Sequence, residues 1–161
     1  MGVSAAGKST VGIALAQALG VPFADADALH SDENTAKMAS GIPLNDDDRW
    51  PWLDAIGARF GESSGTGLVM ACSALKRVYR DRIRAVAPAV IFVHLHGSKQ
   101  LLHSRAAART DHFMPADLLD SQLAILEALG ADEAGFVVDV ADAPEEIVAE
   151  IVEQLGGSAI A

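Results

Sequence analysis

The residues best suited to chemistry stand at the start of the chain, in the stretch GVSAAGKST of residues 2–10. Its spacing fits G-x-x-x-x-G-K-[ST], the pattern of loops that cradle nucleotide phosphates. In such a loop, glycines let successive backbone N–H groups point inward, the lysine reaches the β- and γ-phosphates, and the serine hydroxyl can bind Mg²⁺. The sequence therefore predicts a nucleotide-binding loop formed by Gly2, Ser4, Ala5, Ala6, Gly7, Lys8, Ser9 and Thr10.

Two acids with period-two spacing follow a short predicted strand at residues 21–26. Asp25 and Asp27 stand at its carboxyl end, where ligands bind in open α/β sheets. A hydroxyl that accepts a phosphoryl group needs a carboxylate to orient it and take its proton, and Mg²⁺ needs oxygen ligands. We therefore expect Asp27 to serve the acceptor and Asp25 to support the metal beside Ser9. The alternative is that both acids only solvate a loop.

The chain has few cations, so their positions are informative. Its 12 lysines and arginines stand against 22 acids. Lys76 and Arg80 are four residues apart and share one face of a predicted helix, just past a strand that ends near Ser73. Two cations there suit an anionic substrate. Arg49 follows three aspartates and either binds a carboxylate through its guanidinium or pairs with those acids on a helix surface.

The composition narrows the class of protein. A chain of 161 residues is expected to form one domain. The net charge of −10 argues against nucleic-acid and anionic-membrane partners, and no apolar run approaches the roughly 18 residues of a membrane helix. Cys72 is the single cysteine, so no internal disulfide can form. No secretory signal is visible, so we expect a cytoplasmic protein. The sequence does not decide whether the protein is a monomer or a homodimer.

Strands and helices alternate around these residues. Continuous apolar runs predict buried strands, and helical periodicity with end signals predicts the helices between them. This alternation indicates an α/β fold with a parallel sheet and helices on both faces. The expected strands are 21–26, 68–72, 90–95 and 136–140, and the expected helices run from the loop to Gly20 and over 46–60, 75–86, 98–109 and 143–157, with Gly156 as the last stop.

Longer blocks of the chain resemble the bacterial gluconokinases. These enzymes transfer the γ-phosphate of ATP to the 6-hydroxyl of D-gluconate, and they belong with shikimate and adenylate kinases, whose parallel sheet has the strand order 2-3-1-4-5. The resemblance implies a P-loop kinase of one domain, residues 1–161, that uses ATP, Mg²⁺ and a small sugar acid. It rests on GVSAAGKS at 2–9, DADALH at 25–30, KMASGIPLNDDDRWPWL at 37–53, CSALKRVYRDRIR at 72–84, SRAAARTDHFM at 104–114 and GADE at 130–133.

The same resemblance implies roles for two segments. Residues of about 30–60 would close over the sugar acid, and residues of about 105–116 would form a lid that closes on the transferring phosphate. The alternatives are a kinase for another small hydroxy acid such as shikimate, and a nucleotide-binding regulatory module without transfer activity. The implied substrate contacts are Asp27, His30, Arg49, Ser73, Lys76 and Arg80, and the implied catalytic residues are Lys8, Asp27, Arg105 and Arg109.

The first strand of the related fold is missing, since only Met1 precedes Gly2. In that fold the strand lies in the middle of the sheet. Its absence would leave 68–72 and 90–95 roughly 10 Å apart across an empty position. We therefore expect that Met1 is not the natural start and that a strand of about five apolar residues precedes it. A vacant central position would agree with this expectation, whereas direct pairing of 68–72 with 90–95 would contradict it.

Overall fold

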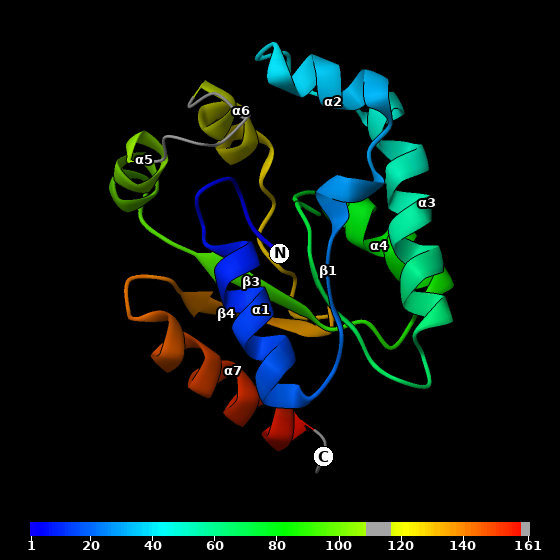
Figure 1. The fold of residues 1–161 in the computed structure, drawn as a ribbon, viewed down its shortest axis with the longest axis vertical. Helices are drawn as coiled ribbons and strands as arrows, with labels where there is room; N and C mark the ends of the chain where they lie inside the picture. The colour runs from blue at the N-terminus through cyan, green and yellow to red at the C-terminus, as the bar shows by residue number, and fades with distance from the viewer. Residues whose placement is uncertain (109–116, 159–161) are drawn as a thin grey trace.

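The computed structural model describes residues 1–108 and 117–158 (Figure 1). Of the expected lid, only residues 105–108 are therefore described, and Arg109 lies outside the described residues. The elements are α1 (Lys8–Leu19), β1 (Phe23–Asp25), the 3-10 turn η1 (Ala26–Leu29), α2 (Asp32–Ala39), α3 (Asp46–Glu62), β2 (Val69–Ala71), α4 (Arg77–Val86), β3 (Phe92–His96), α5 (Lys99–Ala107), α6 (Asp117–Ile125), β4 (Gly135–Asp139) and α7 (Pro144–Ser158).

The strands pair in parallel, in two separate pairs. β1 pairs with β2, with Phe23 opposite Val69, and β3 pairs with β4, with Phe92 opposite Gly135. Helices connect each strand to the next, as parallel pairing requires. The predicted α/β class with a parallel arrangement of strands is therefore confirmed.

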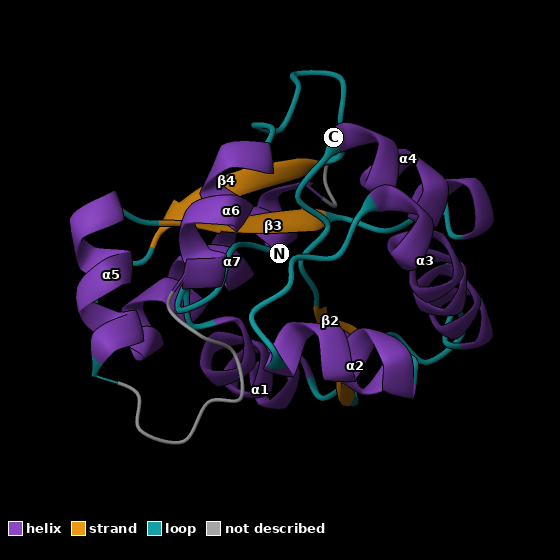
Figure 2. Cartoon of the chain, turned by 90° about the horizontal axis from the view of Figure 1, so that it is seen from above, coloured by secondary structure: helices purple, strands orange, loops and turns teal. Residues whose placement is uncertain are grey.

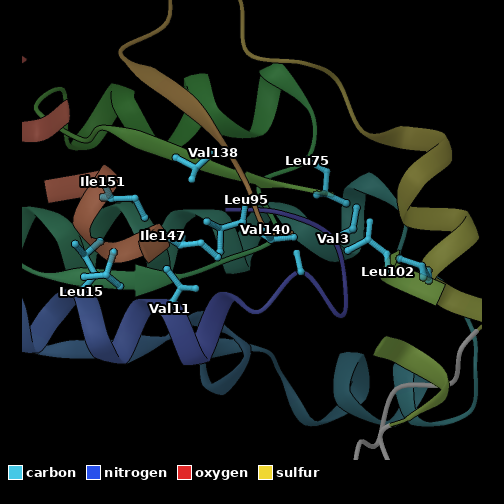
Figure 3. Close-up of a cluster of buried hydrophobic side chains, with 13 residues drawn as sticks. Val3, Val11, Leu15, Leu75, Leu95, Leu102, Val138, Val140, Ile147 and Ile151 are labelled. Carbon is cyan, nitrogen blue, oxygen red and sulfur yellow. The ribbon is translucent and has the colours of Figure 1, made fainter. Parts of the chain in front are cut away.

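Helices cover both faces of the strands. α1 and α7 bury Val11, Leu15, Ile147 and Ile151 together with Leu95 of β3 (Figure 3). Phe92, three residues earlier on β3, points to the other face, because strand side chains alternate. That face is covered by α3 and α4, whose buried side chains in the same cluster are Trp52, Leu53, Ile56, Tyr79 and Ile83.

Two helices differ from the expectation. α2 was not predicted, because residues 32–39 carry no continuous apolar stripe; it is stabilised at its start by the Ser31 side chain, which accepts the Asn34 N–H. α7 was expected to stop at Gly156 but continues to Ser158. One glycine costs a helix only about 1 kcal/mol, and the preceding turns already pack on the core.

Along the described ranges, none of the helices combines the length and the apolar character that crossing a bilayer requires.

A gap separates the two strand pairs (Figure 2). Within the described residues, β2 and β3 do not pair, and a cavity of about 590 Å³ lies between them. Met1 donates its amino group to the Val93 carbonyl, and the Leu95 N–H donates to the Met1 carbonyl at 2.9 Å, which is the bonding of a parallel strand pair. Met1 thus occupies the last position of an otherwise empty central strand. The apolar lining includes Val11, Leu15, Val69, Met70, Val93 and Ile151.

The order β1, β2, gap, β3, β4 corresponds to 2-3-1-4-5 with its central position vacant. The expected vacancy is therefore observed, and the strand that would fill it stays a prediction. An occupant has two requirements. It must offer backbone groups to the open edges of β2 and β3, and it must bring apolar side chains to the cavity.

We predict that five apolar residues joined to Met1 raise the melting temperature by roughly 10 °C, because about 2–4 °C accompanies each kcal/mol in a domain of this size. The segment would pair with both open edges and bury its side chains in the cavity. It would also replace the Met1 ammonium, whose pKa is lowered by burial, with a neutral amide. Calorimetry on the two chains measures the shift. A five-residue extension of glycine, serine and aspartate is the control, and equal melting temperatures for both extensions would contradict the prediction.

Candidate active site

The phosphate loop wraps around the start of α1. Gly7, the residue before the helix, has φ 83°, and Ala5 has φ 61°, so both adopt the left-handed region. At Gly2, an added Cβ would lie 2.8 Å from the Leu95 carbonyl oxygen, so a larger residue does not fit. The loop therefore leads directly into the N-terminus of α1, the end of a helix at which the first N–H groups and the helix dipole favour an anion.

Three further predicted loop residues differ in exposure. Ala6 is buried in the core cluster, Ser4 is half-buried, and Thr10 is exposed on α1. Lys8 is folded back over the loop, and its Nζ donates to the Val3 carbonyl oxygen at 2.9 Å. The ammonium group thus rests beside the loop that it is expected to serve.

Ser9 and the two acids after β1 come together beside this loop. Ser9 Oγ donates to Asp25 Oδ2 at 2.8 Å, and the other carboxylate oxygen of Asp25 accepts the Asp27 N–H at 3.1 Å. The second contact caps the start of η1, the short helix that contains Asp27. A hydroxyl beside a carboxylate is an oxygen donor set of the kind that Mg²⁺ prefers, so these two residues fit the metal that the sequence predicts.

Arg49 lies in a largely buried position at the start of α3, with 6 % of its surface exposed. Its Nε donates to the Leu44 carbonyl at 3.4 Å, and its guanidinium lies 5.7 Å from the centre of the Tyr79 ring. Burial lowers the pKa of Arg49, while Tyr79, Asp46 and the more distant acids, Asp27 among them, oppose that shift. The guanidinium is therefore within electrostatic reach of Asp27. No hydrogen bond joins its terminal nitrogens to the described part of the chain.

His30 lies on the same side, stacked on Trp52 with ring centroids 4.5 Å apart. Trp52 is fixed by a 2.7 Å hydrogen bond from its indole N–H to the Ala26 carbonyl. Burial, with a smaller effect of the Arg49 charge, lowers the pKa of His30 to about 4. His30 is therefore neutral near pH 7 and can exchange hydrogen bonds with hydroxyl groups without adding a positive charge.

Lys76, predicted as a substrate contact, is paired within the protein. Its Nζ donates to Asp46 Oδ1 at 2.7 Å, and the Tyr79 hydroxyl donates to the same oxygen. The Lys76 hydrogen bond is the main cause that lowers the pKa of Asp46, and the same bond raises the pKa of Lys76. This cluster joins the beginnings of α3 and α4. Ser73 is buried between β2 and α4, close to Lys76 in sequence.

Arg80 contradicts the expectation that it contacts the substrate. Its exposure is 0 %, and it forms two hydrogen bonds with Glu133, at 2.6 and 2.8 Å. Its other donors reach backbone carbonyls before α4 and before β4. The hydrogen bonds from Arg80 are the main cause that lowers the pKa of Glu133. Sequence spacing placed Lys76 and Arg80 on one face, but Lys76 stands just before α4, so Arg80 points into the core instead.

Arg105 also has a partner within the protein. Its guanidinium donates to the Val140 carbonyl at 2.7 Å, at the end of β4. Its expected contact with a transferring phosphate stays a prediction, and so does the role of Arg109.

Sequence reasoning missed two polar residues that organise this region. Gln122 of α6 accepts the Ser4 N–H at 2.6 Å, and Asp46 bridges Lys76 and Tyr79. Asp46 carried a weak signal, since it lies among three acids at a helix start. Gln122 carried none, because a single amide far along the chain does not reveal its partner.

Comparison with known proteins places this arrangement in a family. The shikimate kinase family model matches residues 4–156. A Dictyostelium discoideum protein named "Probable gluconokinase" is 47% identical over 167 residues, which are 96% of this chain and 84% of that protein.

Two solved structures are similar over almost the whole chain. A gluconokinase from Sinorhizobium meliloti 1021 has a TM-score of 0.85 and 49% identity, covering 98% of this chain and 94% of that one. An unliganded sugar kinase from Janibacter sp. HTCC2649 has a TM-score of 0.93 and 46% identity, covering 97% and 91%. The fold of this chain therefore agrees with that of these two kinases.

We predict that Arg80→Met lowers the free energy of unfolding by about 3–5 kcal/mol, because it leaves the buried Glu133 carboxylate without its partner. Urea denaturation at pH 7 measures the loss. Arg82→Met is the matched control on α4, since the Arg82 pair with Asp54 is exposed and should leave the urea midpoint close to that of the parent chain. Equal midpoints for the two variants would show that the Arg80 pair does not stabilise the fold.

Proposed function

Because the chain belongs to the shikimate kinase family and, within it, to the gluconokinases, we propose that it phosphorylates D-gluconate in the cytoplasm. The reaction uses ATP and Mg²⁺ and gives 6-phospho-D-gluconate. Residues 1–161 act as one kinase domain, in which residues of about 30–60 bind the sugar acid and residues of about 105–116 act as the lid.

The observation that carries the proposal is the state of Arg49. This guanidinium is largely buried, and its terminal nitrogens have no hydrogen bond to the described residues. A buried cation of this kind is stabilised by a bound anion, and a planar guanidinium matches a carboxylate. Its proximity to Asp27 supports a substrate with a carboxylate toward Arg49 and a hydroxyl toward Asp27.

The transfer itself needs a base and stabilisation of charge. Asp27 orients the 6-hydroxyl and takes its proton as the hydroxyl oxygen forms a bond to the γ-phosphorus of ATP, while the bond from that phosphorus to the ADP oxygen breaks. Lys8 and the loop N–H groups stabilise the charge on the phosphate oxygens. Ser9 and Asp25 would hold Mg²⁺, which supplies charge neutralisation on the phosphates when bound.

We also propose roles for the remaining residues. Arg105 and Arg109 serve the lid, where positive charge near the transferring group favours the transition state. His30, Ser73 and Lys76 stand around the sugar acid, with Lys76 acting together with Asp46. Arg80 supports this site only by fixing α4.

We predict that D-gluconate is used roughly 1000-fold better than D-glucose in kcat/KM, because glucose leaves the Arg49 charge without its anion. A coupled ADP assay over gluconate, shikimate and glucose measures this. Arg49→Met should raise KM for gluconate by about 10- to 100-fold. Arg59→Met is the control, since Arg59 is exposed near the other end of α3. Faster use of shikimate would favour the other hydroxy-acid kinase, and ATP binding without turnover would favour the regulatory module.

We predict that Asp27→Asn keeps ATP affinity but lowers kcat by about 100- to 10,000-fold, because an amide can hold a hydroxyl yet cannot take up its proton. Nucleotide affinity by calorimetry and turnover by the coupled assay are measured separately. Asp32→Asn, at the exposed start of α2, is the control. Loss of ATP affinity with normal turnover at saturating ATP would assign Asp27 to the nucleotide instead.

A further inference from the structure

A side chain from α6 contacts the backbone of the phosphate loop. The amide oxygen of Gln122 accepts the Ser4 N–H at 2.6 Å, and only 9 % of the Gln122 surface is exposed. Figure 1 shows α6 beside the N-terminal loop, on the side away from α1. None of the roles assigned above uses this contact.

The contact fixes one peptide unit of the loop from both ends. The N–H of the Val3–Ser4 peptide donates to Gln122, and its carbonyl accepts Lys8 Nζ at 2.9 Å. A rotation of this peptide would break both hydrogen bonds together. The Val3 carbonyl is a partner of the Lys8 ammonium, so Gln122 acts on Lys8 through this peptide.

α6 is itself held firmly against the same loop. Leu119, three residues before Gln122, is 1 % exposed and belongs to the core cluster that contains Val3 and Leu102. Figure 3 shows Val3 beside Leu102 in this cluster. On its other side, Asp120 of α6 contacts Lys99 of α5 at 2.7 Å. Gln122 is therefore presented from a packed helix rather than from a free loop.

We propose that Gln122 is a positioning residue of the phosphate loop: it fixes the orientation of the Val3–Ser4 peptide and thereby holds the loop and Lys8 ready for the phosphates of ATP. The inference rests on the proposed function only in that the loop binds ATP. Preorganisation of this kind increases affinity because the loop does not have to be ordered on binding. A different role of Gln122 would change ATP affinity in the opposite direction. If Gln122 occupied the place of a phosphate oxygen, ATP would have to displace it, and its removal would increase affinity.

The experiment compares Gln122→Ala and Gln122→Glu with the parent chain, without any acceptor. Hydrogen exchange of the Ser4 amide, followed by NMR, reports the contact itself, and calorimetric titration with MgATP reports its consequence. We expect Gln122→Ala to exchange the Ser4 amide at least tenfold faster and to bind ATP about tenfold more weakly. Gln122→Glu retains an acceptor oxygen and should restore the protection of the Ser4 amide.

Asp120→Ala is the control on the same helix, because it removes an exposed contact to α5 and leaves the loop contact in place. Its ATP affinity should equal that of the parent, and the melting temperature of Gln122→Ala should stay close to that of this control. Unchanged or tighter ATP binding by Gln122→Ala would overturn the proposal, and so would unchanged exchange of the Ser4 amide. Failure of gluconate transfer would leave the comparison intact, since no acceptor is present.

Discussion

The site depends on the close approach of the loop backbone to β3. Gly2 lies so near the Leu95 carbonyl that a Cβ would not fit, and Met1 is hydrogen bonded to the same strand. From this anchored point the loop has only five residues in which to turn and enter α1 at Lys8. The left-handed conformations at Ala5 and Gly7 follow from that short connection. The direction of α1, and with it the position of Ser9 opposite Asp25, is set by this geometry.

The cations near the site are divided between support and recognition. Arg80 forms a buried ion pair with Glu133, and Lys76 forms an ion pair with Asp46, which also accepts the Tyr79 hydroxyl. Both cations therefore stabilise the packing of α3 and α4. Arg49 is buried by this packing, and its terminal nitrogens have no hydrogen bond to residues 1–108 or 117–158. In a chain of net charge −10, a positive group at this place is a strong local feature. Recognition of a carboxylate can therefore rest on one well-supported arginine.

The gap between β2 and β3 affects the protein in a different way. It leaves strand edges and an apolar cavity of about 590 Å³ in the middle of the sheet, next to the anchor of the phosphate loop. An open strand edge can pair with another chain, and unfilled apolar space reduces stability. The helices on the two faces nevertheless keep the strand pairs in the parallel arrangement of the family. The contact between Gln122 and Ser4 holds the same loop from α6.

The sequence by itself determined the features that depend on short spacing. The loop pattern at residues 2–9, the acids Asp25 and Asp27 after a strand, and the alternation of strands and helices are local, so neighbouring residues suffice to predict them. Only the tertiary structure decided that Arg80 is buried against Glu133, that Arg49 is buried beside Leu44, and that Gln122 reaches Ser4 across 118 positions of the chain. The physical reason is that burial and pairing of a polar side chain depend on elements far away in sequence, which periodicity does not encode.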